Sequence, residues 1–351
     1  MPTPYRFAPA VRKDAATGLV ADVYRRMRAE FLLADGPLMS LSPAPELLAA
    51  TWALLREAEL AGSTPRAAKE AAAGAVAYAN RCPFCAEAHA LLIHGTGAHD
   101  LAEAARRGAV PADTGGAAVL AWAGATRTPG DTALAEPPYP AEQAAEFLGT
   151  VLVSHFINRM VTSLLDEEAL VPQPLRRSAL LRRVAGLAVR RTARRALRPG
   201  PGLEVLTGLP TSTPPAWAGD SPIGVAYATL RSIAGAGSEL LSPEALARVS
   251  ATIGAWDGAH APLAATAWLD APLSDLPTAE RPAARLALLA ALAPYRLTDA
   301  DVASWRAADP TAPGSDADLL RLLAYGAMAA VEQIEGWIAP APTATTAGNH
   351  A

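Results

Sequence analysis

Alanine-rich segments dominate this chain and limit what it can fold into. Alanine makes up about a quarter of the 351 residues, whereas aromatic residues make up only 5%. Alanine is the strongest helix former, and β-rich chains favour branched and aromatic residues instead. Hydrophobic residues reach 51%, which excludes a chain that is disordered throughout. We therefore predict an all-α protein whose small side chains allow tight helix packing.

Proline and glycine divide the chain into segments with helical spacing of apolar residues. Beyond residue 203 the pattern is helical to about residue 338, and the tail 339–351 is predicted to be disordered. In the first half we predict helices over residues 17–33, 45–60, 65–79, 83–94, 100–107, 117–125 and 141–165.

Residues 172–198 differ from the rest because they carry nine arginines, from Arg176 to Arg198. The apolar residues Leu180, Leu181, Val184, Leu187 and Val189 lie between these arginines. A basic amphipathic helix can bind a membrane or a nucleic acid, but the rest of the chain has no matching basic field. We predict a linker helix that places one apolar stripe on the body of the protein and leaves its arginines in solvent.

The chain also resembles itself across its two halves. Residues 85–92 match residues 256–263, and residues 147–160 match residues 319–333, both at an offset near 171 to 173 residues. We predict a tandem duplication with a first domain at 1–171, a linker at 172–202 and a degenerate second domain at 203–338.

The second copy has lost the residues that carry chemistry in the first. Ile253 and Trp256 stand where the first copy has its two cysteines, and Leu241 stands where it has a glutamate. His260 keeps the position of a histidine without a thiol partner. The second copy is therefore predicted to have no activity of its own.

Charge and cysteine content exclude several classes of protein. The net charge is −4, with 30 basic and 34 acidic residues, so we expect neither nucleic acid nor an anionic membrane as a partner. No segment has the length and apolar character of a signal peptide or a membrane span. Two cysteines do not make a disulfide-stapled secreted scaffold. We expect a cytoplasmic protein.

Both cysteines lie in one motif, Asn80-Arg-Cys82-Pro-Phe-Cys85-Ala-Glu-Ala-His89. If Pro83 opens a helix, Cys82 is its N-cap and Cys85 lies in its first turn. The helix dipole and unpaired N–H groups favour a thiolate there, and the thiolate is the reactive form of cysteine. His89 follows Cys85 by one turn, close enough to exchange a proton with it. Either cysteine is a candidate nucleophile on position alone.

Glu70 precedes Cys82 by twelve residues, about 18 Å along a straight helix. The break at residues 80–83 lets the preceding helix turn back, so that Glu70 approaches the thiols and His89. A carboxylate beside a thiol and an imidazole makes a proton relay.

Three alternatives compete with this interpretation. A zinc site would need Cys82, Cys85, His89 and His94 to converge, but His94 points about 120° away from Cys82 on the same helix. A thioredoxin-type site needs a strand before its two cysteines, and the flanks here are helical. The cysteines could also be inert core residues. The spacing and the helix geometry favour a redox site over all three.

The pattern Glu70-x11-Cys82-x2-Cys85-x3-His89 resembles the signature of the alkylhydroperoxidase AhpD-like family, within the carboxymuconolactone decarboxylase superfamily. The resemblance covers residues of about 15–170 well. It implies an AhpD-like helical bundle in which Cys85 attacks a hydroperoxide and Cys82 resolves the sulfenic acid into a Cys82–Cys85 disulfide. Glu70 and His89 would shuttle protons.

The resemblance further implies no bound cofactor or metal. An external dithiol reductant protein, which in the family can carry a lipoyl group, would restore the thiols, and family members often form homo-oligomers. The fused, degenerate second half leaves an alternative open, namely a carboxymuconolactone-decarboxylase-like tailoring enzyme or binding protein that uses the pocket without redox cycling.

Overall fold

The computed structural model describes residues 4–31, 35–166, 178–262, 264, 266–309, 311 and 314–339. Within these residues there are helices and no β-sheet, only two isolated β-bridges, which confirms the all-α prediction. The predicted disordered tail from residue 340 onward lies outside the described residues, as do Arg176 and Arg177. None of the described helices has both the length and the apolar character needed to cross a lipid bilayer.

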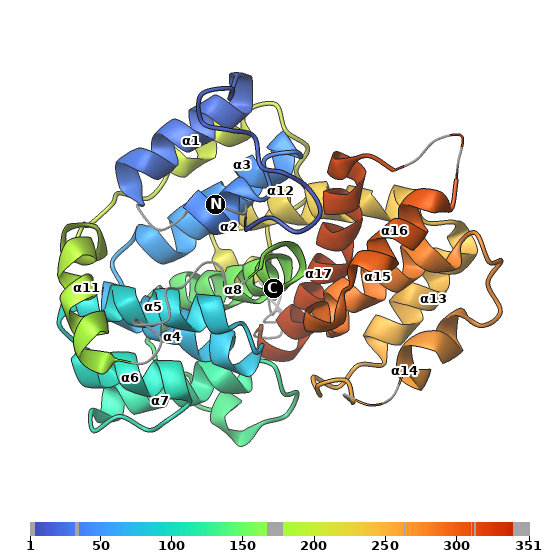
Figure 1. The fold of residues 1–351 in the computed structure, drawn as a ribbon. Helices are drawn as coiled ribbons and strands as arrows, with labels where there is room; N and C mark the ends of the chain where they lie inside the picture. Colours follow the sequence, from blue (N-terminus) through green and yellow to red (C-terminus); the bar gives the residue numbers. More distant parts are fainter. Residues whose placement is uncertain are drawn as a thin grey trace, which may run out of the picture.

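The first half builds a cluster of helices around α4 and α8 (Figure 1). Its helices follow the predicted segments closely, with two differences. Residues 45–60 divide into α3 and a π-helical turn, η1, and the short helix α2 forms where no helix was predicted. The elements are α1 (Gly18–Glu30), α2 (Asp35–Met39), α3 (Pro45–Leu55), η1 (Arg56–Leu60), α4 (Arg66–Ala79), α5 (Pro83–Thr96), α6 (His99–Arg107), α7 (Thr114–Ala125) and α8 (Ala144–Leu164).

The second half packs on the first through long, apolar helices. Helix α17 contacts α8, and α12 contacts α3, so one hydrophobic core continues through both halves. In Figure 1, α8 and α17 lie between α4–α7 on one side and α13–α16 on the other. The elements are α12 (Pro222–Gly235), α13 (Pro243–Gly254), α14 (Ala267–Asp270), α15 (Arg281–Leu292), α16 (Asp299–Ala307) and α17 (Asp316–Ile338).

The two halves share part of their helix order. Helices α12, α13, α15 and α17 follow one another as α3, α4, α7 and α8 do. The exception is the segment matched to α5, because the described residues from 256 to 266 form no helix. Gly258, with φ of +86°, and Pro262 both oppose a helix there. The duplication and its domain boundaries stay a prediction.

The arginine-rich helix α11 (Ala179–Ala193) packs on α5 with the opposite face from the one predicted. Leu180, Val184 and Leu187 are 69%, 56% and 64% exposed, whereas Gly186 is buried. A Cβ on Gly186 would lie 2.8 Å from the Cβ of His94, so the two helices approach as closely as glycine allows. Of the apolar residues predicted to lie on the body only Val189 is buried, at 6% exposure, because close contact between small residues outweighs burial of the larger leucines.

An ion pair accompanies this contact. The buried Arg182 guanidinium donates two hydrogen bonds to Glu103 on α6, at 2.8 and 2.7 Å. These charge-assisted hydrogen bonds offset the cost of burying the Arg182 charge, which explains why the helix turns a charged residue inward.

Candidate active site

The two cysteines lie at the start of α5, as predicted. Cys82 is the N-cap residue, Pro83 is the first helical residue and Cys85 lies in the first turn. A disulfide joins Cys82 to Cys85, with their Cα atoms 5.4 Å apart. Both residues are buried, at 1% and 6% exposure. The spacing therefore places the two sulfur atoms within bonding distance of each other at a helix N-terminus.

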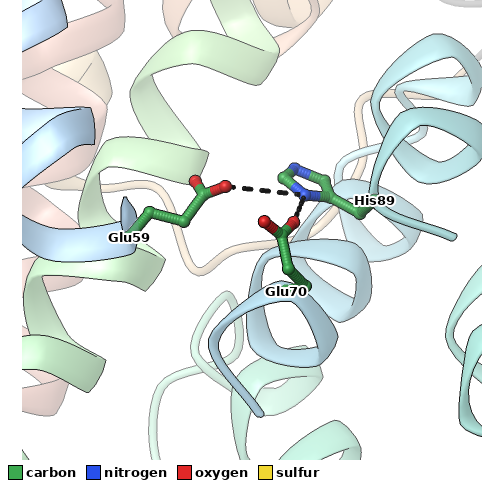
Figure 2. A group of neighbouring side chains, drawn as sticks. All are labelled: Glu59, Glu70 and His89. Carbon is green, nitrogen blue, oxygen red and sulfur yellow. Dashed lines mark hydrogen bonds and ion pairs between the residues drawn. The ribbon is translucent and has the colours of Figure 1, made fainter. Parts of the chain in front are cut away.

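The chain reverses between α4 and α5 and brings Glu70 to His89. Arg81, the residue before Cys82, has φ of +56° in the left-handed region, which turns the chain sharply. As a result His89 Nδ1 lies 2.7 Å from Glu70 Oε2 (Figure 2). The expected approach of Glu70 to His89 is present, whereas its approach to the thiols and its proton-relay role stay predictions.

Two acidic side chains face His89, and sequence reasoning missed one of them (Figure 2). Glu59 lies in η1, and its Oε1 is 4.0 Å from His89 Nδ1. Glu59 is 2% exposed and Glu70 is fully buried. The sequence carried a signal for Glu59, since Arg-Glu-Ala-Glu directly follows the apolar run of α3 and continues its helical segment into the core. A family signature that begins at Glu70 does not include it.

Arg66 balances the negative charge of this cluster. Its guanidinium donates to Glu70 Oε1 at 2.6 Å and lies 4.0 Å from Glu59 Oε1. Burial alone would raise the pKa of Glu70, but Arg66 and the hydrogen bond with His89 lower that pKa to about 2. Burial, followed by the nearby charge of Glu70, raises the pKa of Glu59 to about 7. The two carboxyl groups therefore differ, with Glu70 ionised and Glu59 able to hold a proton near neutral pH.

His89 shares in this charge balance. Burial would lower its pKa, yet the hydrogen bond to Glu70 and the charges of Glu59 and Glu70 raise it above the ordinary value. An imidazole with a raised pKa accepts a proton readily. Such a group can take the proton from a neighbouring thiol.

Glu59, Glu70 and His89 are also the residues that could hold a metal ion, because their ligand atoms lie within 4.8 Å of one another. Arg66 already supplies a positive charge to the same carboxylates, which opposes a cation there. His94 does not join them. Its Nε2 lies 3.2 Å from Glu103 and its ring packs against His99.

A small cavity connects this cluster with Cys85. Its volume is about 50 Å³, and Glu59, Cys85 and His89 all line it. The rest of the lining is apolar: Phe31, Pro37, Leu38, Leu55, Phe84, Ala88, Leu92, Ile157 and Val161. Cys82 instead borders a separate surface groove of about 550 Å³, together with Arg81, Arg106 and His260. The two cysteines therefore line different spaces, Cys85 the small cavity and Cys82 the surface groove.

A buried polar network holds the turn between α4 and α5. The ring of His155 on α8 lies 3.0 Å from the Asn80 amide nitrogen and 2.9 Å from the Thr126 hydroxyl. Burial, with the charges of Arg159 and Arg127, lowers the pKa of His155 far below its ordinary value. His155 is thus a neutral structural residue rather than part of the thiol cavity.

The second half extends this network onto the site. Arg127 donates to the Asn80 side-chain oxygen at 2.9 Å and to the Gly258 carbonyl at 2.7 Å. The ring Nε2 of His260 lies 2.9 Å from the carbonyl oxygen of Ala79. The segment that lacks cysteines therefore supports the cysteine turn of the first half.

Comparison with known proteins agrees with this geometry. An alkyl hydroperoxide reductase of Mycobacterium tuberculosis is 40% identical over 330 residues, which span 93% of this chain and 92% of that protein. No protein-family model matches the chain, and no solved structure matches it. Identity at this level over nearly the full length of both chains establishes common descent, and the site carries the family signature in three dimensions. The chain belongs to the AhpD-like alkylhydroperoxidase family.

Proposed function

We propose that this protein is a peroxidase that reduces an organic hydroperoxide through a Cys82–Cys85 dithiol/disulfide cycle. The observation that carries the proposal is the disulfide at the N-terminus of α5, beside the buried Glu70–His89 pair. The relative's printed name, an alkyl hydroperoxide reductase, supports the same reaction.

Cys85 is the better nucleophile, because it lines the cavity that also holds His89. In the reduced protein, His89 accepts the Cys85 proton and the thiolate attacks the terminal oxygen of the hydroperoxide. The O–O bond breaks, Cys85 becomes a sulfenic acid and the alcohol leaves with a proton. The Cys82 thiol then attacks the Cys85 sulfur, which forms the disulfide and releases water. Two thiols and one hydroperoxide thus yield one disulfide, one alcohol and one water.

The cycle needs two electrons and two protons to restore the thiols. We propose that they come from a dithiol reductant protein, such as one that carries a lipoyl group, and that no bound cofactor takes part. The groove beside Cys82 offers this reductant a second approach, separate from the cavity of the hydroperoxide. A cycle that ends in free thiols suits a reducing compartment, and we therefore place the protein in the cytoplasm.

Self-association is a further part of the proposal. The outer face of α11 exposes Leu180, Val184 and Leu187 in one stripe. A contact between copies would bury this apolar surface. Sedimentation velocity of the full chain reports the oligomeric state, and Leu187→Glu is expected to shift it toward the monomer if this face forms the contact.

Titration of free thiols tests the central proposal. The reduced protein is expected to lose both thiols to one equivalent of cumene hydroperoxide, and Cys85→Ser to lose turnover entirely. Cys82→Ser separates the alternative of a tailoring enzyme or binding protein, because only a redox cycle needs the resolving thiol. Survival of both wild-type thiols in excess hydroperoxide would contradict the proposal.

A further inference from the structure

Glu59 has three features that the relay of Glu70 and His89 leaves unexplained. Its carboxyl group is buried, its Oε1 lies 4.0 Å from the nitrogens of both Arg66 and His89 and accepts no hydrogen bond from them, and it lines the same cavity as Cys85. An unpartnered buried carboxyl oxygen is unfavourable unless something else uses it.

The backbone around Glu59 is also unusual. Residues Arg56–Leu60 form a π-helical turn at the end of α3. Such turns are rare and often mark functional sites, because the extra residue changes the direction of a side chain. Glu57, in the same turn, accepts hydrogen bonds from the backbone N–H groups of Gly200 and Gly202 and so has a structural role. Glu59 has no such backbone partner among the described residues.

We propose that Glu59 is the catalytic acid that gives its proton to the alkoxide leaving group when Cys85 cleaves the hydroperoxide. The proposal rests on the proposed peroxidase function and adds the residue that completes its proton balance. Glu70 cannot take this role, because Arg66 and His89 both hold it as a carboxylate. The raised pKa of Glu59, about 7, agrees with a carboxyl group that remains partly protonated at neutral pH.

The proton then follows a closed route. His89 takes the proton from the Cys85 thiol, and Glu59 donates its own proton to the alkoxide as the O–O bond breaks. The His89 imidazolium next reprotonates the Glu59 carboxylate, which restores both groups. Glu59 Oε1 and His89 Nδ1 are 4.0 Å apart, a distance that one bridging water can span. The cavity of about 50 Å³ has room for it, since a water occupies about 30 Å³ of liquid volume.

The leaving group provides a test that a structural role would not pass. An alkyl hydroperoxide releases a strongly basic alkoxide, whereas a peroxy acid releases a carboxylate that leaves without a proton. We expect Glu59→Gln to lower the rate of thiol loss with cumene hydroperoxide by about 10²-fold and to leave the rate with peracetic acid nearly unchanged. The rates are measured by rapid quench on fully reduced protein.

A pH profile and matched variants complete the experiment. The wild-type rate with cumene hydroperoxide should fall as pH rises through about 7, where Glu59 loses its proton, and Glu59→Gln should lack this decline. Glu57→Gln is the control for loss of a buried glutamate in the same turn. It is expected to lower the rate of thiol loss with both oxidants equally, or with neither. Glu59→Asp keeps an acid and should retain part of the rate with cumene hydroperoxide.

The outcomes separate the two proposals. If wild-type protein keeps both thiols, the peroxidase function itself fails and this inference falls with it. If wild-type protein reacts and Glu59→Gln matches it on cumene hydroperoxide, only the role of Glu59 is overturned. If Glu59→Gln lowers the reaction rate equally with both oxidants, that role is also overturned, because an equal decrease indicates a structural defect.

Discussion

Two segments that follow matching helices have different structures in this molecule. After α4, the chain turns at Arg81 and opens α5 with the cysteines at its start. After α13, the chain turns at residue 255 and continues without a helix through the described residues up to 266. The second segment reaches across to the first, where Gly258 accepts a hydrogen bond from Arg127 and His260 contacts Ala79.

The difference teaches how a region without catalytic side chains can still serve the site. A proline at the first helical position favours a helix, which places Cys82 and Cys85 at a positive helix end. A left-handed glycine and a later proline favour an irregular segment, which leaves backbone carbonyls free to accept from Arg127. The first segment therefore provides the thiols, and the second fixes the turn that carries them.

The substitution expected to disrupt the support of the cysteine turn most strongly is Gly258→Ala. Gly258 has φ of +86°, and a Cβ there would lie 1.8 Å from the backbone oxygen of Arg127. Since a backbone atom cannot yield as a side chain can, we expect the segment to move away and the protein to lose about 3 kcal/mol of stability or more. Urea denaturation measures the loss, and alkylation of the reduced cysteines should accelerate as their turn loosens.

Gly254→Ala is the matched control, because a Cβ at this helical position meets nothing within 4 Å. It should be neutral or slightly stabilising. Unchanged cysteine reactivity in a destabilised Gly258→Ala variant would show that the second segment does not support the turn.

The buried acid cluster of the first half predicts that the stability of the protein depends on pH. The second half adds nothing to this dependence at the matched position, because Leu241 stands there in place of Glu70. Glu59 has its pKa raised from 4.5 to about 7, so between these values the native protein holds a proton that the unfolded chain has released. Stability due to Glu59 therefore falls as pH rises from 4.5 to 7, by up to about 3 kcal/mol. Glu59→Gln should remove this fall, measured as the difference in unfolding free energy between variant and wild type across that range.

Glu70 gives the opposite sign. Its pKa is lowered from 4.5 to about 2, so it stabilises the native state above pH 4.5 and loses that contribution as pH falls toward 2. Glu70→Gln should flatten the acid side of the curve of unfolding free energy against pH.

The prediction for Glu59 has its own contradicting outcome. Parallel curves of unfolding free energy for Glu59→Gln and wild type between pH 4.5 and 7 would contradict the assignment of a raised pKa to Glu59.

Much of the fold and part of the site follow from local sequence. The bounds of α4 and α5, the N-cap position of Cys82 and the approach of Glu70 to His89 all depend on local features, namely a proline, a helix period and one chain reversal between residues 66 and 96. Glu59 was missed because its place beside His89 depends on η1, a π-helical turn that no periodicity predicts. The contact of His260 with Ala79 joins residues 181 apart, and no local pattern specifies that pairing.

The face on which α11 packs is the clearest failure of pattern reasoning, and it offers the smallest and last test. Apolar periodicity predicted burial of the leucines, yet Gly186, Val189 and Ala193 make the contact with α5. The small size of Gly186 and Ala193 allows the two backbones to meet. Gly186→Ala would place a methyl group 2.8 Å from the His94 Cβ, and we expect a loss of about 1–2 kcal/mol. Leu187→Ala, at 64% exposure, should change stability by less than about 0.5 kcal/mol.

Thermal unfolding of the two variants measures this contrast. Helix α5 is held by α11 on one side, whereas the segment around Gly258 holds the turn before α5 through Arg127 and Asn80. Gly186→Ala should therefore weaken the helix without loosening the cysteine turn. Its cysteines should then react at the wild-type rate, unlike those of Gly258→Ala. A larger loss from Leu187→Ala than from Gly186→Ala would mean that the leucine face is the buried one, and the contact through small residues would be wrong.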